Sequence, residues 1–221
     1  MKMSRKFLLA CSMMLLSAAV SQAQLVDITR PGDAIKLVNG TSDGDGSDGA
    51  PPAGEVESHV IDDVGQKYLN FLDFNSGFAV TPSANPSNLP VVGLRLYTAN
   101  DAVERDPASY ELSGSNDGLD GPWTMISSGD LSLPSERTAG GTDVMINPDG
   151  TVVGDAYYQQ VLFGNSASYT HYQLTFPTIK DDVAANSMQI AEVEFLVPEP
   201  TSLGLALSGL LGLGLVSRKR S

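Results

Sequence analysis

The sequence predicts an all-β protein, an antiparallel β-sandwich or jelly roll, flanked by an N-terminal signal peptide and a C-terminal transmembrane helix. Between the two ends no stretch keeps a 3.6-residue apolar period, and short apolar runs are separated by glycine, proline, serine and asparagine. Several runs alternate with a period of two, as where Val92, Leu94 and Leu96 share one face. Eight strand-like runs are predicted, at 35–38, 67–71, 91–97, 109–112, 123–126, 157–163, 169–176 and 188–196.

The first element is a signal peptide over residues 1–23. Residues 1–6 carry three basic side chains, residues 7–20 are largely apolar, and small residues precede a cut after Ala23. This order is typical of a Sec-type export signal. A lipoprotein signal with lipid on Cys11 is the alternative, but only four apolar residues precede that cysteine in the apolar region.

The central part, residues 24–197, is predicted to be one domain of 174 residues without cysteine, because Cys11 is the only cysteine of the chain. No disulfide can stabilise it, although an exported compartment would permit one. The predicted ends hold six of the 13 basic and one of the 26 acidic residues, so the domain keeps 7 basic and 25 acidic residues, a net charge of −18. This charge repels phosphates and argues against a nucleic-acid partner.

Catalytic motifs are absent from the sequence, and we do not predict an enzyme. His59 and His171 are the only histidines, and neither an HExxH nor a GxSxG pattern occurs. His171 is interpreted as a polar strand residue. Trp123, the only tryptophan, begins a strand-like run with Met125 two positions on, which predicts that it lies in the core instead of forming a sugar platform.

The last strand-like run changes its phase. Met188 and Ile190 would share one face, whereas Val193 and Phe195 follow in the opposite phase. A one-residue β-bulge near Ala191-Glu192 would restore a common apolar face and free backbone carbonyls. Burial of the strand on both faces explains the pattern equally well.

The C-terminal segment, residues 198–221, is predicted to be a membrane span with a basic end. Residues 203–216 are apolar apart from one serine and carry no charge, and 14 residues give about 21 Å of helix. Extension to residues 201–217 reaches the lower limit for a span, roughly 17 residues. The basic residues after it would stay cytoplasmic; they are Arg218, Lys219 and Arg220. A buried C-terminal core helix is the alternative.

These features resemble the PEP-CTERM sorting signal of Gram-negative bacteria. The resemblance rests on the order of Pro198-Glu199-Pro200, the short glycine- and leucine-rich span and the terminal basic residues. It implies that an exosortase, a membrane protease-transpeptidase, removes the span. The protein would be exported by Sec, held transiently in the inner membrane, and passed to the cell surface or extracellular matrix.

The domain carries a second resemblance, which covers roughly residues 55–196. The stretches that carry it are Val60-Ile61-Asp62-Asp63, Lys67-Tyr68-Leu69-Asn70-Phe71, Gly93 to Gly118, Trp123-Thr124-Met125-Ile126, Tyr172 to Phe176, and Met188 to Phe195. In this order they resemble the discoidin, or F5/8 type C, family of galactose-binding-like β-sandwiches. The resemblance implies a β-sandwich that binds ligands through loops at one end.

The same resemblance implies a structural Ca²⁺ site. Its carboxylate ligands map onto Asp62 and Glu192, with the carbonyl of Ala191 as a further ligand, and Ca²⁺ prefers such oxygen ligands. Gln66 stands where the family usually has a small hydroxyl residue that helps to bind the ion. Either a glutamine or backbone oxygen replaces that ligand, or the site is lost.

Two functions follow. The first is an exported, non-catalytic module that binds carbohydrate, namely an extracellular polysaccharide. The second is a structural surface protein that makes protein contacts without binding glycan. The ligand-binding residues are not identified by the sequence.

Overall fold

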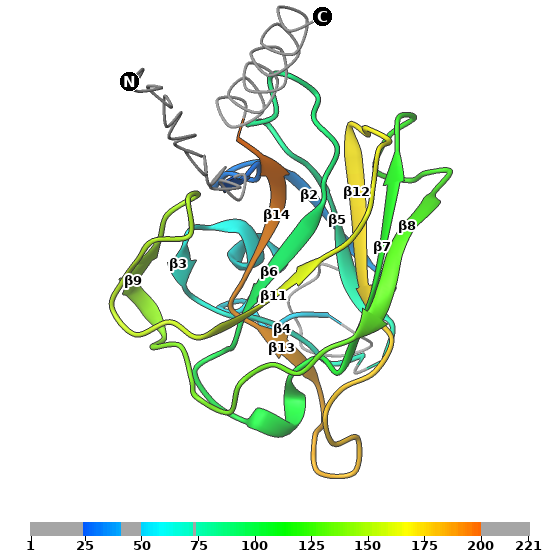
Figure 1. The fold of residues 1–221 in the computed structure, drawn as a ribbon. Helices are drawn as coiled ribbons and strands as arrows, with labels where there is room; N and C mark the ends of the chain where they lie inside the picture. The colour runs from blue at the N-terminus through cyan, green and yellow to red at the C-terminus, as the bar shows by residue number, and fades with distance from the viewer. Residues whose placement is uncertain (1–23, 41–49, 73, 200–221) are drawn as a thin grey trace, which may run out of the picture.

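The computed structural model describes residues 24–40, 50–72 and 74–199, which form two packed antiparallel sheets (Figure 1). The larger sheet has five strands in the order β2-β5-β12-β7-β8. The strands are β2 (Ala34–Val38), β5 (Ser76–Thr81), β7 (Ser109–Ser115), β8 (Thr124–Asp130) and β12 (His171–Phe176). The predicted all-β, antiparallel class is therefore confirmed.

The second sheet has four strands in the order β1-β14-β6-β11. They are β1 (Leu25–Asp27), β6 (Gly93–Tyr97), β11 (Tyr158–Leu162) and β14 (Glu192–Pro198). Two small sheets complete the fold, β10-β9-β3 and β13-β4. Their strands are β3 (Val64–Gly65), β4 (Tyr68–Asn70), β9 (Gly141–Ile146), β10 (Val152–Val153) and β13 (Met188–Ile190).

The hydrophobic core lies between the two main sheets. Phe195 of β14 contacts Phe78 of β5, with ring centroids 6.1 Å apart, and Tyr172 of β12, at 5.7 Å. In β12 buried and partly exposed residues alternate strictly, as its period of two predicts. This alternation places one face of the larger sheet on the core and the other toward solvent.

The four-stranded sheet is also covered on part of its outer face. Tyr97 and Ala191 pack there with Val144 and Ile146, two residues of β9, in a second buried cluster. β6 is consequently buried along its whole length, and the charged side chain of Arg95 lies under this cover.

The predicted final strand is two strands. β13 pairs with β4 and ends at Ile190, and β14 pairs with β6 from Glu192 onward, so Ala191 is the point where the chain changes partners. Every residue from Met188 to Val197 is also buried. Both readings of the phase change therefore hold in part: the pairing is interrupted at the expected position, and both faces are covered.

The prediction that Trp123 lies in the core is wrong. The tryptophan is only half-buried and precedes β8, and Met125 on that strand is 53% exposed. β8 is an edge strand of the five-stranded sheet, so its alternation does not imply burial. His171 begins β12 as a polar strand residue, with Nδ1 2.7 Å from the Thr81 hydroxyl.

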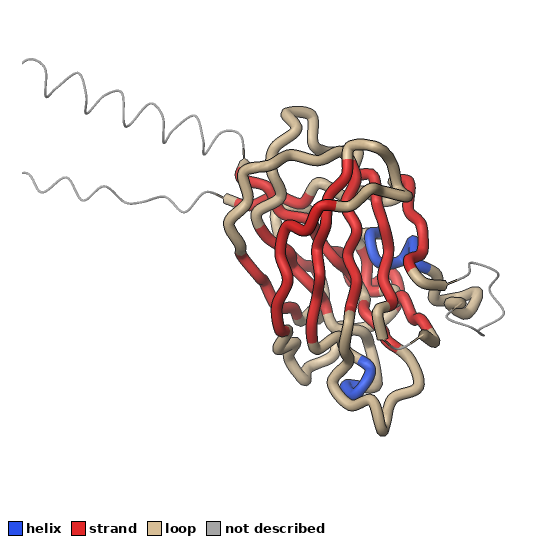
Figure 2. The backbone as a smooth tube through the Cα atoms, turned by 90° about the vertical axis from the view of Figure 1, so that its right-hand side faces the viewer, coloured by secondary structure: helices blue, strands red, loops and turns tan. Residues whose placement is uncertain are grey.

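The two ends of the described domain lie side by side. β1 pairs with β14 in the register Leu25↔Pro198, and the Glu199 N–H donates to the Gln24 carbonyl at 2.7 Å. In Figure 2 the 3-10 helix η2 (Val103–Arg105) lies at the opposite end of the sandwich. Pro198 is thus the last residue of β14.

The predictions for the two hydrophobic ends concern residues outside the described ranges. These are the signal peptide, Pro200, the span and its basic residues. Within the described ranges, no helix has the length and apolar character that a membrane crossing requires.

Candidate functional site: a carboxylate pair and a loop-end pocket

The structure brings the sequence-predicted cation ligands together. Asp62 follows the short 3-10 helix η1 (Glu57–Ile61), and Glu192 is the first residue of β14. One carboxylate oxygen of Glu192, Oε2, accepts the backbone N–H groups of Asp62 at 3.0 Å and Asp63 at 3.2 Å. Asp63 has a φ of 62°, a left-handed conformation that turns the chain at this point. Ala191 adjoins Glu192, and its N–H donates to the Tyr97 carbonyl at 3.0 Å.

The carboxylate of Glu192 is fully buried and carries an unsatisfied acceptor. Its Oε1 has no hydrogen-bond partner among the described residues. Burial raises the pKa of Glu192 well above its usual value, and the nearby charges of Asp62, Asp27, Asp63 and Glu194 raise it further. Burial therefore disfavours the ionised form of this carboxylate, and a bound cation would offset that cost.

Asp62 is in a similar state. Burial raises its pKa to about 7, although hydrogen bonds from the Val64 N–H and the Gln66 side chain oppose the shift. The Asp62 carboxylate and the free oxygen of Glu192 are ligands that suit a hard divalent cation such as Ca²⁺. No group of three or more His, Cys, Asp or Glu side chains with metal-binding geometry occurs in the described part of the chain, so neutral oxygens would have to complete the shell.

Gln66 reaches this pair through its side chain. Its Nε2 donates to Asp62 Oδ2 at 2.9 Å, while the Val64 N–H donates to Asp62 Oδ1 at 3.1 Å. The side-chain amide of Gln66 therefore contacts the Asp62 carboxylate directly. Rotation of this amide would present its oxygen to the same place.

A small pocket lies directly beside Gln66. Its volume is about 220 Å³, and it is lined by Gly54, Glu55, Gly65, Gln66, Lys67, Asn100, Gly140 and Gly141. We call it the loop-end pocket. Its residue Asn100 follows the end of β6 at Tyr97, which pairs with Glu192 at the start of β14. The pairing of β14 with β1 lies at the other end of β14. The glycines leave backbone on the pocket walls; a Cβ on Gly140 would come within 2.8 Å of Asn100 Nδ2.

Two ion pairs hold Lys67 in the lining of this pocket. Its side chain is 10% exposed, and Nζ lies 3.3 Å from Glu55 Oε1 and 2.9 Å from Asp101 Oδ2. The ion pairs join three separate segments of the chain. Hydrogen bonding to Lys67 lowers the pKa of Asp101, although burial opposes that shift most strongly.

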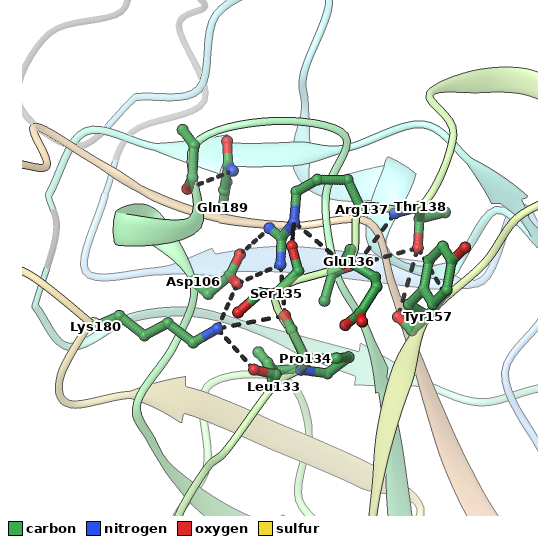
Figure 3. A network of polar contacts seen from close by, with 12 residues as sticks. Asp106, Leu133, Pro134, Ser135, Glu136, Arg137, Thr138, Tyr157, Lys180 and Gln189 are labelled. Carbon is green, nitrogen blue, oxygen red and sulfur yellow. Dashed lines mark hydrogen bonds and ion pairs between the residues drawn. The ribbon is translucent and has the colours of Figure 1, made fainter.

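Sequence reasoning missed a charged network around the buried Asp106 (Figure 3). Buried Asp106 accepts two hydrogen bonds from Arg137, both 2.7 Å long, and one from Lys180 at 2.9 Å. Arg137 also donates to the carbonyls of Asp101 and Pro134. These bonds hold the loops after β6, β8 and β12 in one arrangement. The scarcity of basic residues in an acidic domain was the available signal, because each is then expected to pair with a carboxylate.

Comparison with known proteins finds similarity only at the level of solved structures. No family model matches the chain, and no curated protein matches it. The family 32 carbohydrate-binding module of Clostridium perfringens NanJ, in complex with galactose, is 12% identical, with 79% of this chain and 99% of that chain covered and a TM-score of 0.48.

Two further structures show the same level of similarity. The paired family 32 modules of C. perfringens ZmpB, in complex with GalNAc, are 14% identical, covering 80% of this chain and 37% of that chain at a TM-score of 0.49. A chitosan-binding module from Paenibacillus sp. IK-5 is 11% identical, covering 76% and 96% at 0.44. These neighbours are carbohydrate-binding modules, but at such identities and TM-scores they carry no argument about this chain's activity.

Proposed function

We propose that this chain is an exported, non-catalytic module that binds an extracellular polysaccharide in its loop-end pocket. The observation that carries the proposal is the pocket lining. Glu55, Gln66, Lys67 and Asn100 present a carboxylate, two amides and an ammonium group around one cavity. Sugar hydroxyls donate and accept hydrogen bonds, so this mixed set of donors and acceptors suits them.

We also propose that the carboxylate pair beside the pocket is the site of a structural Ca²⁺. Asp62 and Glu192 would hold the ion, with the carbonyl of Ala191 and the Gln66 amide oxygen as further ligands. When bound, the ion supplies positive charge that offsets the buried carboxylates. Gln66 touches both features, because it lines the pocket and contacts Asp62. Ca²⁺ would therefore order one wall of the sugar site.

The pocket chemistry does not suit hydrolysis. Most glycosidases need two carboxyl groups on either side of the bond that is cleaved. Glu55 is the only carboxylate among the described residues that line the pocket, and it is paired with Lys67. Binding without turnover is the function that this arrangement supports.

Export and sorting remain proposals from the sequence, and the fold supports them by its geometry. Gln24 and Glu199 adjoin each other, so the predicted cleavage and sorting signals both flank one end of the domain. β14 runs from that end to Glu192 beside the loop-end pocket. A domain attached by its tail would thus present the pocket outward after exosortase processing.

A second candidate function is protein contact without glycan. β11 is an edge strand of its sheet, and its Tyr158 and Leu162 side chains are 44% and 60% exposed. Edge strands with exposed apolar residues can pair with other chains. This arrangement is the observation that favours a structural surface role.

A glycan array tests the proposed function. The full chain, purified in a detergent without a sugar headgroup, is applied in Ca²⁺ and in chelator. We expect binding to polysaccharide fragments that is weakened by Asn100→Ala and retained by Lys36→Ala, which changes an exposed cation of the other sheet. Absence of binding to every glycan would favour the structural role.

A further inference from the structure

A second cavity lies on the outer face of the four-stranded sheet, at the end where the chain enters and leaves the domain. Its volume is about 530 Å³, larger than that of the loop-end pocket. Its lining is Gln24, Leu25, Val92, Arg95, Asp149, Gln160, Leu162 and Phe163. We call it the sheet-face pocket. Its size is in the range of small-molecule sites, about 300–1,000 Å³.

Arg95 is a buried charged residue in the lining of this pocket, and its neighbours fix its position. The residue is 5% exposed, and its guanidinium contacts Glu194, donates to Gln160 Oε1 at 3.2 Å, and lies 5.3 Å from the centroid of the Tyr158 ring. Its Nε has no hydrogen-bond partner among the described residues. A buried, fixed donor without a partner is costly unless something else accepts its hydrogen bond.

Two glycines allow close packing around this pocket. A Cβ on Gly150, which has a φ of 82°, would lie 2.4 Å from Arg95 Nη1, so only glycine lets the β9–β10 loop close over the guanidinium. A Cβ on Gly93 would lie 2.7 Å from Leu162 Cδ2. The absence of a side chain on Gly93 lets Leu162 pack directly against β6.

The remaining lining determines the class of ligand. Gln24, Gln160 and Asp149 add hydrogen-bonding groups, whereas Leu25, Val92, Leu162 and Phe163 supply an apolar side. The charge of Arg95 is already paired with Glu194, so the pocket offers no free cation to an anionic ligand. A net charge of −18 over residues 24–197 repels anions further. An uncharged ring with hydroxyls on its rim and an apolar face fits both sides.

We propose that the sheet-face pocket is a second saccharide site, which takes an uncharged pyranose unit. The two pockets lie at opposite ends of β14, so one molecule could hold two sugar chains or two places on one chain. That the sugar belongs to a polysaccharide rests on the function proposed above, whereas the pocket itself depends only on its own lining.

The test is calorimetric titration of the full chain, in the same detergent, with neutral oligosaccharides of glucose, galactose, mannose and N-acetylglucosamine. We expect the unmodified chain to bind two oligosaccharide molecules. Asp149→Ala and Gln160→Ala each remove a polar group on an exposed residue and should weaken one of the two sites about tenfold. Asp143 is another exposed residue, on β9 and outside the lining, so Asp143→Ala should change neither site.

The failures are distinguishable. Binding that survives Asn100→Ala but is lost in Asp149→Ala supports the sheet-face pocket and overturns the loop-end site. Binding at one site that is insensitive to Asp149→Ala and Gln160→Ala overturns the sheet-face pocket alone. The sheet-face pocket is also overturned if no neutral sugar binds, or if only uronic-acid oligosaccharides bind.

Discussion

Asp62 and Glu192, 130 positions apart in the chain, are joined by a hydrogen bond of 3.0 Å from the backbone of one to the side chain of the other. The bond uses only one oxygen of Glu192 and leaves the second buried without a partner among the described residues. The fold therefore fixes the position of a carboxylate that its own hydrogen bonds do not satisfy. This relationship motivates the first prediction.

Ca²⁺ should stabilise the protein through this carboxylate. At free Ca²⁺ 100-fold above Kd we expect a gain in the free energy of unfolding of about 2.7 kcal/mol. Glu192→Gln should abolish the gain, because it removes the charge that binds the ion, whereas exposed Glu136→Gln should keep it. Thermal melts in Ca²⁺ and in chelator measure both. The same melting temperature of the unmodified chain in Ca²⁺ and in chelator would contradict the cation site.

Asp27 should make stability depend on pH. Burial raises its pKa to about 7, against the hydrogen bonds from Thr29 and Phe195 and the charge of Arg30. Between pH 3.8 and about 7 the folded chain holds a proton that the unfolded chain has released. This contribution to stability is complete below that window and is lost as pH rises through 7. Its size is on the order of a few kcal/mol.

Asp27→Asn should flatten this dependence. An asparagine can keep the Oδ1 acceptor for the N–H groups of Thr29 and Phe195 and donate to the Thr29 hydroxyl. Urea denaturation in chelator at pH 5 and pH 8 should show a smaller difference than in the unmodified chain. An unchanged difference would exclude Asp27 as its source.

Arg137 should matter more for stability than its partial exposure suggests. Arg137→Met leaves the buried Asp106 carboxylate with Lys180 as its remaining cation. We expect a loss of about 3 kcal/mol, at the lower end for breaking a buried ion pair. Arg105→Met is the matched control, because Arg105 forms no ion pair within the described ranges, and it should stay within about 0.5 kcal/mol. Equal effects of the two variants would contradict a special role for Arg137.

Gly114 and Tyr169 should be energetically coupled. A Cβ on Gly114 would lie 2.3 Å from the Tyr169 ring, which packs edge-on against Tyr172 with centroids 6.3 Å apart. Gly114→Ala should destabilise the chain by about 1–3 kcal/mol through overpacking. In a Tyr169→Ala background the same change should cost less. A double-mutant cycle measured by urea denaturation tests this, and strict additivity would refute the contact.

How far the sequence predicts the fold depends on each strand's surroundings. β12 was predictable because large residues alternate on its core face. β5 was missed because it holds only two large apolar residues, Phe78 and Val80. The stretch that leads into them, Asn75-Ser76-Gly77, also resembles a turn. β9 was missed because the residues at its start are small, polar and exposed.

The proximity of Asp62 and Glu192 was predictable only from the resemblance of this sequence to the discoidin family. Nothing in local spacing links Asp62 to Glu192, because their proximity depends on the pairing of β14 with β6 and on the turn after η1. Lys67, Asn100 and Arg95 come from separate strands and loops, and no sequence pattern places them around cavities. Tertiary pairing, which a single sequence does not encode at short range, determines these sites.

The course of β14 has a mechanical consequence. A molecule held at Glu199 and pulled at the loops beside Glu192 would be loaded along this strand, which pairs with β6 on one side and β1 on the other. Force along a strand strains its ladder of hydrogen bonds together, whereas force across the ladder opens them one at a time. We therefore expect single-molecule traction in this direction to need more force than traction between residues 24 and 199, which would unzip β1 from β14.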